Sequence, residues 1–246
     1  MMCWLKRAAC ALALVALLSA AAGCAKKEEE PKPTTPAAAE EPKKPEIPEE
    51  LMTQGARLFG APFERKLHMK MTYSIEPGDT QEYFVYRDAE ISRKDGVVVV
   101  TSKLVNAPFG LDQGEVYEIR KDGVWAVSVG QSTFDPAFRA LPAEVTEGAT
   151  WSYETVAGTM RMKAKVVNVR KETVAVPLGE FEAWRVETQG TLEAPGITGT
   201  LQEVSYYVEG IGTVKSDMTS VRTSAGDGGT PTKATLTVRM EAIPEP

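Results

Sequence analysis

Hydrophobic and polar residues alternate with a period of two along several stretches of this chain. The longest of these stretches are residues 67–75, 160–166 and 234–242, and a shorter one spans 125–129. Successive side chains of a β-strand point to opposite faces of its sheet, so such alternation is typical of strands. Each stretch therefore predicts a strand that is buried on one side only.

Turn-forming residues divide the chain into roughly ten to twelve expected strands. Asp95-Gly96 and Asp122-Gly123 are typical hairpin turns, and Gly, Pro and Asp separate the other stretches. A short helix is expected at Glu49–Phe59, and no long segment after the first 25 residues has a helical period. A doubly wound α/β fold needs helices between its strands, so the pattern excludes that fold.

The predicted fold class is therefore all-β and mainly antiparallel. One-sided alternation favours an antiparallel sheet with one solvated face, and such a sheet must curl or close to protect its edges. We expect a curled sheet with a barrel-like or half-barrel architecture. A sandwich of two sheets is the alternative.

Residues 1–23 have the pattern of an export signal. Lys6 and Arg7 precede an apolar stretch from Ala8 to Ala22. This stretch is shorter than the ~20 residues that cross a bilayer, and the small residues at its end suit cleavage. An uncleaved transmembrane anchor is the alternative interpretation.

The end of this segment, Ala21-Ala22-Gly23-Cys24, resembles the lipobox of bacterial lipoproteins. The resemblance implies cleavage between Gly23 and Cys24 and acyl chains, such as palmitate, attached to Cys24. A single acyl chain holds a protein only reversibly, but two or three hold it permanently. We therefore expect a membrane-anchored protein of the cell envelope that faces the periplasm or the exterior. Ala25 follows the cysteine where an aspartate would favour the inner membrane, so the outer membrane is favoured in a host that has one.

Residues 24–50 are expected to form a disordered tether between the lipidated cysteine and a single globular domain at 51–246. The tether is rich in Pro, Lys and Glu, and Ile47 is its one large apolar residue. Such a composition buries too little surface to offset the entropy of ordering. In an extended form the segment spans about 80 Å.

Charge and cysteine content exclude several classes of function. The formal net charge is −6, and it becomes −8 without Lys6 and Arg7 (26 basic against 34 acidic residues). An acidic domain without clustered cations is a poor partner for nucleic acid. The three cysteines are Cys3, Cys10 and Cys24, so the predicted domain has no disulfide, thiolate nucleophile or cysteine-bound metal.

Three blocks of the second half form an ordered set: residues 141–153 with Gly148-Ala149-Thr150-Trp151, residues 172–186 with Val176-Pro177-Leu178-Gly179, and residues 206–215 with Gly210-Ile211-Gly212. Over residues 140–217 this set resembles the TapB-like class of exported bacterial domains. That resemblance implies a β-rich domain outside the cytoplasm and no particular reaction. The glycines and Pro177 suit turns and strand ends, and the aromatic residues suit the core.

The sequence contains no recognisable catalytic or metal site, and we expect no cofactor. His68 is the only histidine, and it falls on the polar side of its predicted strand. A Ser-His-Asp triad or a histidine-based zinc site would have to use this residue. Carboxylates are plentiful, but none of them, including Glu180 and Glu182, is marked as one of a catalytic pair. The chain is therefore predicted not to be an enzyme.

Three aromatic residues are candidates for contact with an apolar ligand. Phe109, Phe134 and Phe138 fall in stretches that resemble loops, and Phe134 and Phe138 are spaced to share one face of a helical turn. Alternatively, they plug the open end of the curled sheet.

Three functions therefore stay open. The first is a non-catalytic envelope lipoprotein that holds a lipid or another apolar ligand within the curled sheet. The second is a structural or assembly lipoprotein that uses its surface to bind an envelope partner, and the third is a hydrolase with two carboxylates. An apolar cavity lined by strands favours the first, a filled core favours the second, and two carboxylates converging in a cleft favour the third.

Overall fold

The computed structural model describes residues 46–76, 78–95, 97–108, 114–225 and 231–246. Gly23, Cys24 and Phe109, named above as candidate residues, lie outside the described residues. Lys43–Pro246 forms one compact unit, and every strand pairing given below lies within it. We therefore expect this segment to fold without the residues that precede it.

Two short helices precede the strands: η1 (Glu49–Leu51) and α1 (Gln54–Phe59). The strands are β1 (Leu67–Glu76), β2 (Thr80–Lys94), β3 (Val97–Val105), β4 (Glu115–Arg120), β5 (Gly123–Val129), β6 (Ser132–Pro142), β7 (Trp151–Ala157), β8 (Met160–Val176), β9 (Gly179–Ala194), β10 (Ile197–Val208), β11 (Gly212–Ala225) and β12 (Pro231–Ala242).

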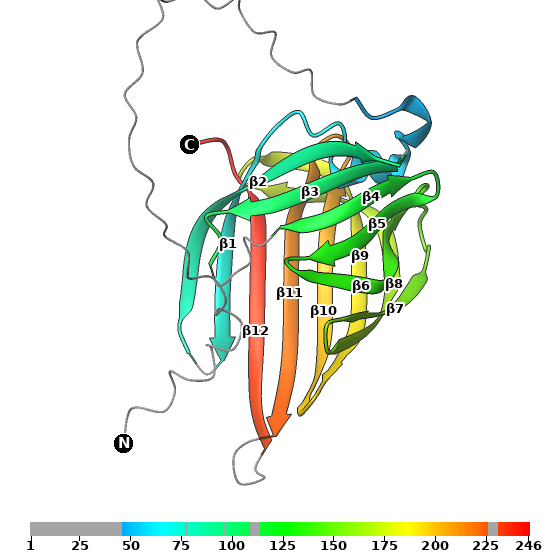
Figure 1. Ribbon diagram of the computed structural model, residues 1–246. Helices are drawn as coiled ribbons and strands as arrows, with labels where there is room; N and C mark the ends of the chain where they lie inside the picture. The colour runs from blue at the N-terminus through cyan, green and yellow to red at the C-terminus, as the bar shows by residue number, and fades with distance from the viewer. Residues whose placement is uncertain (1–45, 77, 96, 109–113, 226–230) are drawn as a thin grey trace, which may run out of the picture. The chain divides into compact units, whose positions relative to one another are not determined.

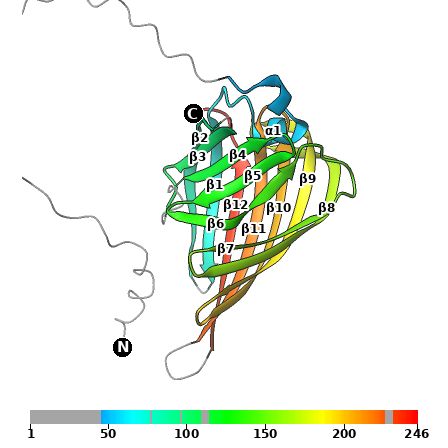
Figure 2. The same cartoon turned by 45° about the vertical axis from the view of Figure 1, so that its right-hand side comes forward.

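Within the described part of the chain, these twelve strands close into one barrel (Figure 1 and Figure 2). Each strand pairs with the strands before and after it, all pairs are antiparallel, and β1 pairs with β12 to close the ring. The predicted all-β, barrel-like fold is confirmed, and the two-sheet sandwich is excluded. The short helix expected at Glu49–Phe59 is present as η1 and α1.

The alternating pattern places apolar side chains inside the barrel and charged side chains outside. On β1, Met69 and Met71 are fully buried, while Lys70 between them forms an outer ion pair with Glu82 of β2 at 2.7 Å. On β12, Val238 is buried. The same inside-outside division therefore holds on both sides of the strand pair that closes the barrel.

The shorter pattern at 125–129 predicted a strand correctly but gives the wrong buried side. Val124 and Ala126 of β5 are buried. The indole Nε1 of Trp125 instead donates a hydrogen bond to Asp122 Oδ1 at 2.9 Å, and Arg120 lies over its ring. A polar partner and a stacked cation stabilise a tryptophan on the outer wall, so its size alone does not decide which way it points.

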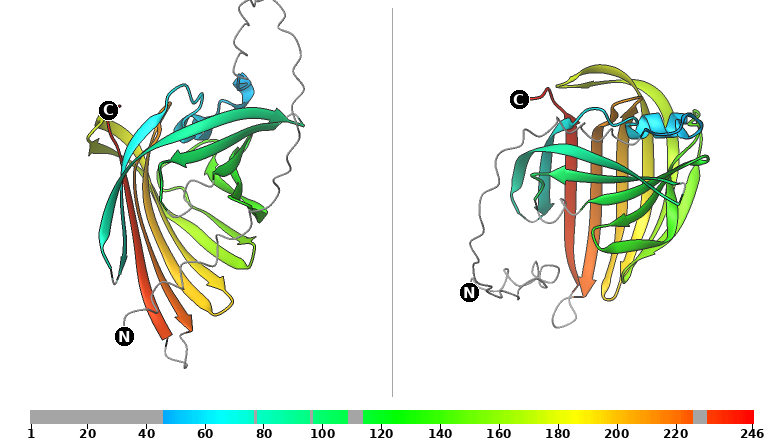
Figure 3. Two further views of the ribbon diagram at one scale, coloured as in Figure 1. Left: turned by 60° about the vertical axis from the view of Figure 1, so that its left-hand side comes forward. Right: turned by 45° about the horizontal axis from the view of Figure 1, so that its top comes forward.

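One end of the barrel is closed by α1, which packs into a cluster that we call the helix-end cluster. Leu58 and Phe59 of α1 meet buried residues of six strands there: Val98, Val100, Ile119, Val124, Leu141, Val166, Trp184 and Val186. Thr53 caps the start of α1 by accepting a hydrogen bond from Ala56 N at 3.2 Å. The right-hand view of Figure 3 looks towards this end and shows α1 lying across it.

A second group of buried residues, the seam cluster, lies around the pairing of β1 with β12. Its members include Leu67, Met69, Met71, Val85, Val238 and Ala242. The turn between β8 and β9 reaches this region, where Leu178 N donates a hydrogen bond to Ala242 O at 3.0 Å. The two clusters leave part of the barrel interior unfilled.

Candidate functional site

A cavity of about 380 Å³ lies inside the barrel, and we call it the lumen cavity. Its walls include members of both clusters, among them Leu141 of the helix-end cluster and Met240 near the seam. Further apolar side chains on its walls are Leu104, Ala126, Phe138 and Met162. The volume falls in the range of about 300–1,000 Å³ that is usual for small-molecule sites.

Polar side chains from β2, β4 and β10 also face the lumen cavity. Arg87 belongs to the same inward phase of β2 as buried Val85, and Glu115 and Tyr117 share the inward phase of β4 with Ile119. On β10, every second residue lines the cavity: Glu203, Ser205 and Tyr207. The alternation that defines the strands thus brings charged groups into the interior.

The two carboxylates of the lumen already accept hydrogen bonds from neighbouring hydroxyl groups. Tyr117 Oη donates to Glu115 Oε2 at 2.8 Å. Ser205 Oγ donates to Glu203 Oε1 at 2.7 Å, and Ser216 Oγ lies 3.4 Å from the same oxygen. These bonds fix the orientation of both carboxylates.

Three tyrosines that line the cavity are held in their protonated form. Burial raises the pKa of Tyr117, Tyr153 and Tyr207, and nearby carboxylates raise it further. Arg87 opposes this effect at Tyr117 and Tyr207 but does not reverse it. All three phenols are therefore neutral at physiological pH and keep their hydroxyl protons.

The alternation of apolar and polar residues does not by itself predict the polar side of the lumen, which includes Arg87 and Glu203. Polar residues within a strand were assigned to the solvated face, which is the usual outcome. The signal that was available is the phase of β2, where Tyr83, Val85 and Ala89 lie on the same face as Arg87.

Phe134 and Phe138 were predicted to lie in loops, and this is wrong, because both belong to β6. Pro136 between them suggested a loop, since proline cannot donate a ladder hydrogen bond. In the structure Pro136 pairs with neither neighbouring strand, so its missing donor is not needed. The two phenylalanine rings do share a face, with centroids 5.0 Å apart, and Phe138 lines the lumen cavity.

Strands β6 and β7 are joined by fewer paired residues than the other neighbouring strands of the barrel. Only Phe134 and Asp135 of β6 pair with β7. Beyond them, a hydrogen bond from Thr155 Oγ1 to Pro136 O at 2.7 Å replaces the ladder. A second pocket, which we call the side pocket, lies between the diverging strands and shares Phe138 and Tyr153 with the lumen cavity.

An aromatic stack separates the side pocket from the lumen. The rings of Phe138 and Tyr153 are stacked with centroids 4.1 Å apart and planes 9° from parallel. Trp151, the next inward residue of β7, also borders both spaces. Side-chain packing therefore closes the wall where backbone pairing is lost.

The other residues considered in the sequence lie away from the lumen. His68 lies on the outward phase of β1, and its Nε2 is 3.9 Å from Glu245 Oε1. Within the described ranges, no group of three or more His, Cys, Asp or Glu side chains is arranged to hold a metal ion. Glu180 and Glu182 fall next to the β8–β9 turn and are exposed.

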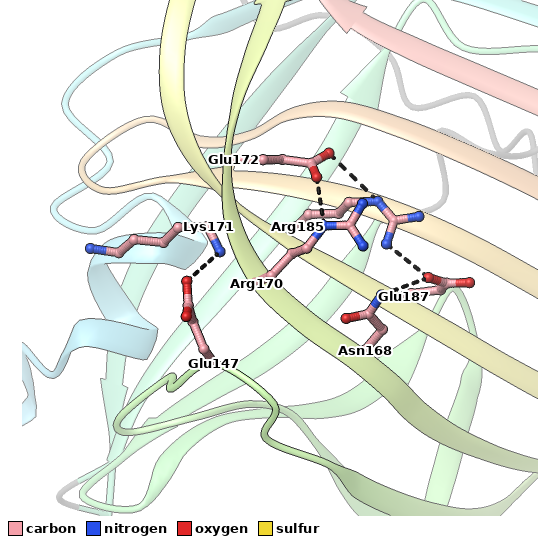
Figure 4. A network of polar contacts seen from close by, with 7 residues as sticks. All are labelled: Glu147, Asn168, Arg170, Lys171, Glu172, Arg185 and Glu187. Atoms are coloured by element: carbon pink, nitrogen blue, oxygen red, sulfur yellow. Dashed lines mark hydrogen bonds and ion pairs between the residues drawn. The ribbon is translucent and has the colours of Figure 1, made fainter.

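A polar network occupies the outer face of β8 and β9 (Figure 4). Arg170 and Arg185 lie opposite each other on the two strands, and carboxylates join them. Arg185 Nη1 donates to Glu187 Oε2 at 2.8 Å, and its Nε lies 3.7 Å from Glu172 Oε1. Arg170 Nε donates to the other oxygen of Glu172 at 2.6 Å. The network ties β8 to β9 beside the register shift at Val166/Asn168.

This network makes the stability of the barrel dependent on pH. Burial raises the pKa of Glu172, but hydrogen bonds from Arg170 and Tyr206 outweigh it and leave the pKa below its usual value. The Arg185 hydrogen bond likewise lowers the pKa of Glu187. A lowered carboxyl pKa in the folded state stabilises the protein above the unfolded pKa of about 4.3. The stabilisation is lost as the pH falls through the folded value.

Replacing Arg185 by methionine is expected to lower the free energy of unfolding by about 1–2 kcal/mol at pH 7. The difference from wild type should shrink below about pH 4, where the carboxylates become protonated in both proteins. Urea titrations at pH 7 and pH 3 measure this. Arg161→Met is the control and should change stability little, because Arg161 of β8 forms only an exposed ion pair with Glu154 of β7, at 4.0 Å. An equal loss at both pH values for Arg185→Met would contradict the electrostatic role.

Among the described residues, no helix has the length and apolar composition needed to span a bilayer.

No family model, curated protein or solved structure matches this chain. The resemblance of residues 140–217 to the TapB-like class, and that of residues 21–24 to a lipobox, therefore stay predictions.

Proposed function

We propose that this chain is a non-catalytic lipoprotein of the cell envelope that holds a lipid or another apolar ligand inside its barrel. The lumen cavity carries the proposal: a closed wall of strands encloses about 380 Å³ with predominantly apolar lining. A structural protein that acts through its surface has no need of an unfilled interior. A well-packed core would also be more stable, because cavities cost stability.

The polarity of the barrel wall supports a ligand inside and water outside. Ion pairs cross the outer face at several strand pairs, for example Arg239 Nε to Asp217 Oδ1 and Lys215 Nζ to Glu241 Oε1, both at 3.1 Å. A barrel that faces lipid carries its apolar side chains outward. The arrangement here is the reverse, so an apolar ligand gains most from the interior.

Native mass spectrometry tests this function directly. The Lys43–Pro246 segment, exported by its host without Cys24, should co-purify with a defined lipid or other apolar molecule. Lipid extraction of the same sample identifies that molecule. A protein that emerges empty, and stays empty when envelope lipids are offered, would overturn the proposal. It would leave an assembly role, which crosslinking in cells would then address.

A lipid anchor on Cys24 forms part of the same proposal. Cells fed an alkyne-tagged palmitate should label the full-length chain, and the label should be lost in Cys24→Ala. Cys10→Ala removes the neighbouring cysteine of the apolar stretch and should leave the label unchanged. Equal labelling of the two variants would show that Cys24 is not the modified residue.

A hydrolase is the second candidate, and one observation favours it: Glu115 and Glu203 line the same cavity. Two-carboxylate hydrolysis requires one acid and one base or nucleophile at a suitable separation. The mass spectrometry distinguishes the two functions. A hydrolase converts the offered ligand, and Glu115→Gln or Glu203→Gln abolishes the conversion, whereas a carrier returns its ligand unchanged.

A further inference from the structure

Two buried hydrogen-bond donors of the lumen lack a protein partner. Within the described part of the chain, three buried side-chain atoms have no hydrogen-bond partner: Arg87 Nε, Trp151 Nε1 and Ser220 Oγ. The first two are N–H groups of residues that line the lumen cavity. Buried donors are nearly always paired in folded proteins, so unpaired donors on residues that line a cavity indicate a ligand with acceptor atoms.

Arg87 is also a cation without an ion pair among the described residues. The carboxylates of Glu115 and Glu203 line the same cavity, but each is held by hydroxyl donors, at 2.8 Å from Tyr117 and 2.7 Å from Ser205. The acidic groups of the lumen are thus engaged, whereas the guanidinium is not. A guanidinium group binds carboxylates and phosphates through several parallel hydrogen bonds.

Tyrosine hydroxyls add to the polar surroundings of Arg87. Arg87, Tyr117 of β4 and Tyr207 of β10 line the same cavity, and the charge of Arg87 lowers the pKa of both phenols. Both phenols stay protonated, because burial raises their pKa. Neutral phenols do not repel an anion, as phenolates would.

The remaining walls suit an apolar chain. Leu104, Ala126, Phe138, Leu141, Met162 and Met240 all face the cavity. A volume of about 380 Å³ lies near the lower end of the range for small-molecule sites, which favours a ligand with one chain. The ligand must therefore combine a single apolar chain with one group that accepts hydrogen bonds.

We propose that the lumen cavity binds a single-chain amphiphile with an anionic oxyacid head, and that Arg87 is the residue that recognises the head. This inference rests on the proposed carrier function and names its ligand class. The head is a carboxylate, as in a fatty acid, or a phosphate monoester, as in a lysophosphatidate. Trp151 Nε1 offers a second donor to the oxygens of the ligand.

Calorimetric titration of the Lys43–Pro246 segment tests this recognition. Four probes with the same sixteen-carbon chain are compared: palmitate, 1-palmitoyl lysophosphatidate, methyl palmitate and hexadecylamine. We expect at least one of the two acids to bind about ten- to a hundredfold more tightly than the methyl ester, the range expected for hydrogen bonds to a charged group. The acid that binds more tightly identifies the head.

Substitutions locate the effect at Arg87. Arg87→Met should remove most of the preference for the acid and leave the affinity for methyl palmitate nearly unchanged. Arg87→Lys keeps the charge but loses the planar fork, and it should restore part of the preference. Arg239→Met, on the outer wall, is the matched control and should bind as wild type does. Thermal unfolding of each variant confirms that the barrel is intact.

The outcomes separate this inference from the proposed function. If the acids and the ester bind equally, or if Arg87→Met keeps the preference, head recognition by Arg87 is wrong and the carrier function stands. If hexadecylamine binds most tightly, the carboxylates Glu115 and Glu203 recognise the head instead. If no probe binds and no lipid co-purifies, the carrier function itself fails.

Discussion

Gly123→Ala is expected to destabilise the barrel by at least about 3 kcal/mol, a large share of the 5–15 kcal/mol typical of a whole domain. Gly123 begins β5 with φ of +137°, and a methyl group there would lie 2.1 Å from Leu141 O. Backbone, and not a flexible side chain, occupies this position, because Gly123 pairs directly with Pro142 of β6. The two strands would have to separate beside the buried Val124 and Leu141.

A substitution at a second glycine, Gly148, separates the steric cause of this destabilisation from the conformational one. Gly148 also has a positive φ, of +74°, but a methyl group there meets nothing within 4 Å. Gly148→Ala should therefore cost only the strain of the left-handed conformation, about 1 kcal/mol. Urea unfolding of the two variants measures the difference. Equal losses would show that conformation, and not the contact with β6, limits position 123.

Thr188→Trp is expected to abolish ligand binding while the barrel stays folded. Thr188 lies on β9 and lines the lumen cavity, where its neighbours across the strands are Val166 and Glu203. An indole at this position occupies much of the space that an acyl chain would need. The affinity for palmitate and for its methyl ester should both fall more than a hundredfold, a loss of about 2.7 kcal/mol or more.

Gln189→Trp is the matched control, because Gln189 is the next residue of β9 and lies exposed on the outer face. It introduces the same side chain outside the barrel and should leave binding unchanged. Circular dichroism and the melting temperature verify the fold of both variants. If Thr188→Trp binds both probes as wild type does, the ligand does not occupy the lumen and the carrier function is wrong.

The strands of this protein were predictable because their signal is local. In β1 and β12 one side chain in two is apolar over most of the strand, so the pattern gives both the strand and its buried face. β5 shows where such a signal fails. Six of its seven residues are apolar, and they fall on both faces, so the larger Trp125 suggested the wrong side. The hydrogen bond to Asp122 that holds Trp125 outside cannot be inferred from periodicity.

The closure of the barrel and the polar residues of its lumen were harder to predict from the sequence. Closure depends on β1 pairing with β12, which lies far away along the chain, and no local pattern distinguishes a closed barrel from a half-barrel. Arg87 faces inward because the strand phase set by Val85 requires it. A lumen that side chains do not fill tolerates such a residue, whereas a packed core would not. The inward position of Arg87 can therefore be inferred only once the closed barrel is known.

The short pairing between β6 and β7 has a consequence for how fast the proposed carrier would exchange its ligand. Opening the barrel at the β1–β12 seam breaks a ladder of eight residue pairs, and at β8–β9 one of fifteen. Opening between β6 and β7 breaks only two residue pairs, together with the Thr155 hydrogen bond and the stack of Phe138 on Tyr153. Local opening is least costly where the ladder is shortest. The residence time of the proposed ligand is therefore expected to depend on local opening between β6 and β7. Amide hydrogens of β7 should be among the first in the barrel wall to exchange with solvent.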